Sequence, residues 1–112
     1  MSDNKSFACW IDLRQKYRLA KKNKDYLKII SYSNQIIELS QKDSSIGIMV
    51  PLFEYDIAES YSKLGDNENA LKYYIFSKNH FISYRATHQL SKPEDFLSYI
   101  TKIDKKIGKL QK

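Results

Sequence analysis

The segment Ile57–Tyr74, with the sequence IAESYSKLGDNENALKYY, most constrains how this chain can fold. Tyr61 and Leu64 lie on the apolar stripe of one amphipathic helix, and a second apolar stripe begins after the corner. Gly65 suits the left-handed conformation that commonly ends a helix, because glycine has no Cβ to clash there. Asp66 suits the first position of the next helix, where its carboxylate faces free N–H groups. The segment therefore predicts an αα-hairpin.

The same residues resemble a tetratricopeptide (TPR) repeat, a helical hairpin that recurs with a period of about 34 residues. Glu54 stands where the family has tryptophan, and Ala58 replaces a glycine but is still small enough for close helix packing. The family pattern W-x2-L-G-x2-Y…A-x3-F falls here on Glu54, Ile57, Ala58, Tyr61, Ala70 and Tyr74.

A second, more degenerate match to this pattern precedes the first. It uses Trp10, Leu13, Arg14 and Tyr17, followed by Tyr26 and Ile30. Arg14 and Tyr26 are large where the family has small residues, so we expect wider or rotated packing of this hairpin. Trp10 and Glu54 lie 44 residues apart, about ten more than the family period.

The spacing of apolar residues predicts about five helices in a single domain that spans residues 1–112. We expect the first hairpin at about residues 6–41, the second at about residues 49–87 and a capping helix at about residues 92–110. Ser91 and Glu94 suit a capping box at the start of that last helix, with Pro93 in its first turn. The expected fold class is all-α: antiparallel helical hairpins in a TPR-like α-solenoid, with a C-terminal capping helix.

The sequence contains no recognisable catalytic constellation. His80 and His88 lack a cysteine or carboxylate at the spacing of a metal site. Cys9 is expected to be a small buried residue, and the three glycines are isolated, unlike those of a phosphate-binding loop. We therefore expect a protein that is not an enzyme, with no catalytic, cofactor-binding or metal-binding residues and no cofactor.

The N-terminal residues lack the charged and apolar regions of a secretory signal. The longest apolar run, Ile46–Phe53, is interrupted by Gly47 and Pro51, and it is shorter than the roughly 20 residues that a membrane-spanning helix needs. We therefore expect a cytoplasmic protein with no membrane partner.

The resemblance also implies where a partner would bind. In TPR-like arrays the first helix of each hairpin lines a groove that holds an extended peptide or a partner helix. The partner-binding residues implied in this way are Ile11, Asp12, Gln15, Arg18, Leu52, Tyr55, Asp56, Glu59 and Ser62. Tyr55 and Glu59 pair an aromatic anchor with a charge, and the carboxylates in this set favour a neutral or basic segment.

Two other functions compete with protein binding. The net charge is +6, and lysines gather on the first and last helices, so nucleic-acid binding is the alternative. It ranks second because those lysines crowd the last turns, where the helix dipole favours cations, and because no aromatic residues interleave them. A homo-oligomer joined through Tyr73, Phe76 and Tyr84 is a third possibility. The preferred function is non-enzymatic binding of a protein or peptide partner through the groove.

Overall fold

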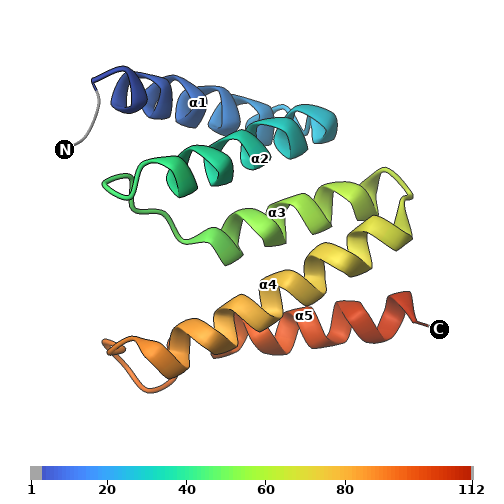
Figure 1. Cartoon of the computed structure of the whole chain (residues 1–112). Coiled ribbons are helices and arrows are strands. Elements are labelled where there is room, and N and C mark those ends of the chain that lie inside the picture. The colour runs from blue at the N-terminus through green and yellow to red at the C-terminus, as the bar shows by residue number, and fades with distance from the viewer. Residues whose placement is uncertain (1–3, 112) are drawn as a thin grey trace.

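The computed structural model describes residues 4–111; residues 1–3 and 112 of the expected domain lie outside the described part. These residues form five helices and no strand: α1 (Asn4–Lys22), α2 (Tyr26–Lys42), α3 (Val50–Lys63), α4 (Asn67–Thr87) and α5 (Leu97–Leu110). Consecutive helices run antiparallel and stack in chain order from α1 to α5 (Figure 1). The all-α class is therefore confirmed.

The stack is flat, with dimensions of 47 × 34 × 21 Å. Within the described residues, close backbone approach between helices is confined to consecutive helices, and α3 and α4 form the most extensive of these contacts. None of the helices in residues 4–111 combines the length and the apolar character that crossing a bilayer requires.

The main core lies between α3, α4 and α5. Its fully buried residues are Ala58, Ala70, Tyr74, Phe81 and Ile103. Ala58 of α3 and Ala70 of α4 are small, so the two helices can approach closely while Tyr74 and Phe81 fill the space beyond them. Small residues at these two positions thus account for the extensive packing of α3 against α4.

The corner between α3 and α4 forms as its sequence predicts. Gly65 has φ +82°, in the left-handed region. The amide of Asp66 donates to the carbonyl of Tyr61 at 2.9 Å, and the amide of Gly65 donates to the carbonyl of Ser62 at 3.1 Å. These two bonds make a Schellman motif. Asp66 then caps α4, because its Oδ1 accepts from the amide of Asn69 at 3.1 Å.

The start of α5 differs from the expected one. Ser91 and Glu94 form no capping box, and the helix begins at Leu97, after Phe96 in the left-handed conformation with φ +69°. The ring of Phe96 stacks on Phe81 with centroids 5.6 Å apart and meets Tyr84 at 5.5 Å. At its start α5 therefore has aromatic contacts and no side-chain hydrogen bond that caps the helix.

Two side chains expected to be apolar and inward-facing are exposed. Cys9 is exposed, and it borders a hollow lined by residues of α1 and α2. Leu64, the last residue of the apolar stripe of α3, is 45% exposed because it directly follows the last residue of that helix.

Two glycines offer a matched test of the corner. Gly65→Ala should lower the free energy of unfolding by about 1–2 kcal/mol, because alanine is strained in the left-handed conformation. Gly108 lies within α5, and a Cβ added there meets nothing within 4 Å. Gly108→Ala should therefore raise the free energy of unfolding by up to about 1 kcal/mol. Urea denaturation measures both changes, and a shift in the same direction for both variants would contradict this account.

Candidate partner-binding groove

Asp56 of α3 joins that helix to α1. The hydroxyl of Tyr17 donates to Oδ2 of Asp56, and Nζ of Lys21 lies 3.3 Å from the same oxygen. The ring of Tyr17 also packs on Phe53, with centroids 5.1 Å apart. Burial and the bond to Asp56 both raise the pKa of Tyr17, so its hydroxyl remains a donor. Side chains thus hold α1 and α3 together without close backbone contact.

Glu59 joins α3 to α4 and α5 in the same way. Its carboxylate accepts from the hydroxyl of Tyr55 at 2.5 Å and from that of Tyr74 at 2.7 Å. Nζ of Lys106 lies 3.6 Å from Oε2. Burial by itself raises the pKa of Glu59, but the bonds from both tyrosines and the charge of Lys106 outweigh it, and the net pKa is lowered. The carboxylate therefore stays ionised inside a network of donors.

A hollow of about 270 Å³ opens between α1, α3 and α5. Its lining consists of Tyr17, Lys21, Leu52, Tyr55, Asp56, Tyr99 and Lys102. Tyr99 and Lys102, together with Ser98, also border an adjoining hollow of about 220 Å³. We call the two hollows together the α1/α3/α5 groove.

Rings and cations alternate in this groove. Nζ of Lys102 lies 5.7 Å from the ring centroid of Tyr55 and 5.9 Å from that of Tyr99. The rings of Tyr55 and Tyr99 meet edge to face, 5.6 Å apart. On the α1 side, Lys21 lies 5.4 Å from the ring of Tyr17. The structure therefore corrects the expectation that no aromatic residues interleave the lysines.

The structure brings together part of the expected binding set. Leu52, Tyr55 and Asp56 line the groove, and Glu59 lies next to it with its carboxylate occupied by Tyr55. The other expected residues lie outside the lining of the groove: Ile11, Asp12, Gln15, Arg18 and Ser62. The four of these that belong to α1 are exposed, and Ser62 is partly buried.

Five residues of the groove were missed by sequence reasoning: Tyr17, Lys21, Ser98, Tyr99 and Lys102. Tyr17 fell on an interior position of the repeat pattern, and α5 was interpreted as a cap rather than as a helix that lines the groove. A signal was present, because each tyrosine is followed by a lysine three or four residues later. That spacing places both side chains on one helix face.

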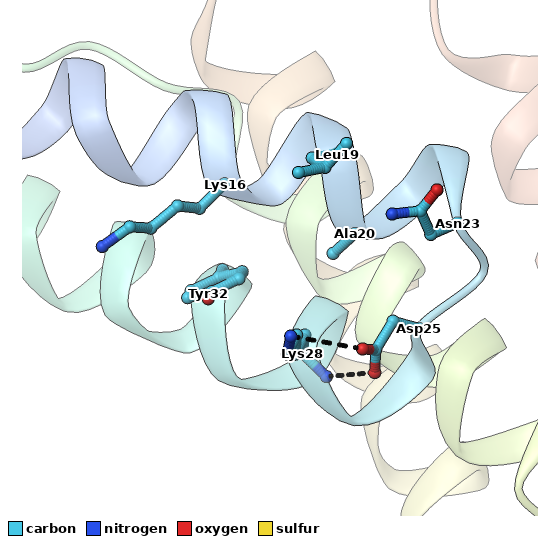
Figure 2. A pocket seen from close by; sticks show the side chains of 7 residues that line it. All are labelled: Lys16, Leu19, Ala20, Asn23, Asp25, Lys28 and Tyr32. Carbon is cyan, nitrogen blue, oxygen red and sulfur yellow. Dashed lines mark hydrogen bonds and ion pairs between the residues drawn. The ribbon is translucent and has the colours of Figure 1, made fainter.

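A smaller hollow of about 80 Å³ lies between α1 and α2 (Figure 2). Lys16 and Tyr32 stand at one end and Asp25 at the other. Asp25 is already used, since it caps α2 by accepting from the amide of Lys28 and pairs with the ammonium of that lysine at 3.7 Å. This hollow is therefore a weaker candidate than the groove.

The histidines serve separate local contacts. Nδ1 of His80 lies 2.6 Å from Oε1 of Glu54. Glu54 is buried, with only 6% of its surface exposed. Burial raises the pKa of Glu54 against the opposing effect of His80. His88 stacks on Tyr84, with ring centroids 3.9 Å apart. Within residues 4–111, no group of three or more His, Cys, Asp or Glu side chains is placed to hold a metal ion.

The aromatic residues considered for self-association belong to two clusters. Tyr73 and Phe76 contact each other, and Tyr73 stacks on Tyr61 of α3. Tyr84 instead contacts Phe96 and His88 at the far end of α4. The rings of Tyr73 and Phe76 thus make different ring contacts from the ring of Tyr84.

Compared with protein-family models, curated proteins and solved structures, the chain gives no match. The resemblance to TPR repeats therefore rests on the residues of this chain alone.

Glu59 and Glu54, two of the three carboxylates of α3, should respond to acid in opposite directions. Glu59→Gln should lower the free energy of unfolding near neutral pH by about 1–2 kcal/mol, because the tyrosine hydroxyls lose a charged acceptor. The folded pKa of Glu59 is lowered, so its contribution is present above its ordinary pKa and is lost as pH falls through the folded pKa. The difference between wild type and Glu59→Gln should therefore shrink on acidification.

Glu54 has a raised pKa, so the folded state takes up its proton more readily than the unfolded state does. Acidification towards the ordinary pKa should therefore stabilise wild type relative to Glu54→Gln. Urea denaturation from about pH 7 to about pH 3 measures both differences. Each difference is the free energy of unfolding of wild type minus that of the variant. The opposite roles given to Glu59 and Glu54 are wrong if both differences rise, or both fall, on acidification.

Proposed function

We propose that this protein is a non-enzymatic interaction module that binds an extended segment of a partner protein in the α1/α3/α5 groove. One observation carries the proposal: three helices that are not consecutive in the chain meet at one lined hollow. In this proposal the hairpins act as a short TPR-like array, and α5 serves as a third groove helix. The groove differs in that respect from the one implied by the repeat pattern alone.

The lining of the groove has the character of a recognition surface. Tyrosine is common among residues that dominate binding energy, because its ring gives a large contact area and its hydroxyl can bond. Tyr55 contacts both Tyr74 and Tyr99, and its hydroxyl is bound to Glu59. These contacts hold the ring in place before a partner arrives, so little side-chain entropy is lost on binding.

The size of the hollows favours a peptide over a small molecule. They measure about 270 and 220 Å³, each below the roughly 300–1,000 Å³ typical of small-molecule pockets. Each is suited to a single side chain of an extended segment that crosses both.

Nucleic acid is the second candidate, because Lys21 and Lys102 lie against tyrosine rings in the groove. Base stacking needs free ring faces. The ring of Tyr99, however, already stacks on Phe81, with ring centroids 5.2 Å apart. Nζ of Lys102 also lies 5.9 Å from the ring centroid of Tyr99. Two lysines also neutralise few phosphates. These features favour a peptide.

The test is selection of binders from a random peptide library displayed on phage, followed by mapping on the ¹⁵N-labelled protein. The largest amide shift changes should occur at groove residues such as Leu52, Tyr55 and Lys102. Changes centred on the outer face of α4, near Ile75 and Phe76, would overturn the proposal, as would failure to select any binder.

A pair of variants gives a second readout. Ser98 borders the groove, whereas Ser83 is exposed on α4 away from it. Ser98→Trp should weaken binding of the selected peptides by about tenfold or more, or about 1.4 kcal/mol, because the new ring obstructs the groove. Ser83→Trp should leave the affinity unchanged. Equal effects of the two variants would count against the groove, with circular dichroism as the folding control.

A further inference from the structure

We infer that the segment bound in the α1/α3/α5 groove is acidic, and that Lys102 receives one of its side-chain carboxylates. This inference rests on the proposed function and adds the chemistry of the partner. It also reverses the preference for a neutral or basic segment that the sequence alone implies.

The carboxylates behind that earlier preference are all occupied by the protein itself. Asp56 is bound by Tyr17 and Lys21, and Asp12 pairs with Lys16 at 2.9 Å. Glu59 is bound by two tyrosine hydroxyls and by a lysine. A cationic partner would have to compete with these internal donors, so the groove presents little free negative charge.

Lys102 is the positive charge that remains in the groove. Among the described residues no carboxylate forms an ion pair with it. By contrast, Lys78 of α4 pairs with Asp104, and Lys106 of α5 pairs with Glu59. Its ammonium lies against the rings of Tyr55 and Tyr99. Lys102 also borders both hollows of the groove. An anionic side chain in either hollow therefore finds an unpaired ammonium.

The surroundings of Lys102 strengthen this complementarity. Tyr55 and Tyr99 are both partly buried, so a carboxylate held between them and Lys102 is partly shielded from water. A charge pair is stronger in such a site than on an open surface. The net charge of +6 for the whole chain also steers an acidic segment towards the protein.

The first test is the composition of the peptides that the library selection returns. Peptides that map to the groove should be enriched in Asp and Glu and depleted in Lys and Arg relative to the unselected library. One of them is then made with both ends blocked, so that only side-chain carboxylates carry negative charge. Replacing its Glu by Gln, and its Asp by Asn, should lower the affinity by about tenfold or more.

The second test is a matched charge reversal on α5. Lys102→Glu should weaken binding of the end-blocked acidic peptide by at least about tenfold, because it places a negative charge beside the negative charges of the peptide. Lys105 is exposed on the same helix and outside the lining of the groove. Lys105→Glu makes the same change in net charge and should alter the affinity less than about twofold, since it acts only through long-range steering.

The possible failures are distinguishable. Neutral or basic peptides that map to the groove would overturn the acidic partner and leave the proposed function standing. Equal weakening by Lys102→Glu and Lys105→Glu would show that net charge acts and that Lys102 is not the receiving group. A single-stranded oligonucleotide that displaces the acidic peptide and binds more tightly would identify nucleic acid as the occupant. If no selected peptide maps to the groove, both proposals fail.

Discussion

Two of the three carboxylates of α3, Asp56 and Glu59, link helices beyond what consecutive packing provides. Asp56 reaches α1 through Tyr17 and Lys21, and Glu59 reaches α5 through Lys106. The two lie three residues apart, so they project from nearly the same side of α3. Close backbone contacts join only consecutive helices in the described part of the chain, so these side-chain links set how α1 and α5 flank α3. Asp56 lines the groove, and Glu59 lies next to it through its bond with Tyr55.

The way these carboxylates are satisfied determines the charge of the groove. Glu59 receives two neutral hydroxyl donors from Tyr55 and Tyr74, which solvate its charge as water would. Asp56 receives one such donor from Tyr17. Hydroxyl donors stabilise an anion without cancelling it, but each carboxylate also has a lysine within ion-pair distance. The acidic residues of the groove thus hold the structure together, and they leave Lys102 as the group available to a ligand.

The sequence predicted features that depend on local interactions. The corner at Gly65 and Asp66 formed as expected, because its left-handed turn and its cap involve residues close in the chain. The helices likewise follow the apolar periodicity. The start of α5 did not follow its local signal: the capping box of Ser91 and Glu94 is absent, and Phe96 packs on Phe81 of α4 instead. A long-range aromatic contact prevailed there over a local polar one.

The candidate site was predicted in part for the same reason. The resemblance implied Leu52, Tyr55 and Asp56 as groove residues of α3, and these three line the groove. The α1 residues that it implied lie outside the lining of the groove, and the first hairpin is the one whose sequence matches the repeat pattern less well. The spacing of Tyr99 and Lys102 could place the lysine beside a ring, but whether Lys102 is free depends on which carboxylates are already paired. Pairing across helices is a property of the folded chain, and charges counted along the sequence do not reveal it.

The groove shares its walls with the core, and this limits which of its residues can change. Tyr55 and Tyr99 both pack against the buried cluster that includes Tyr74 and Phe81. Substitution of either ring removes core packing together with the binding surface, so its effect on affinity is inseparable from its effect on stability. Lys102 is different, because it is exposed and lies against the two rings without belonging to the buried cluster. In the proposed function, a single surface position would therefore change the charge preference of the groove while the helices that form it stay in place.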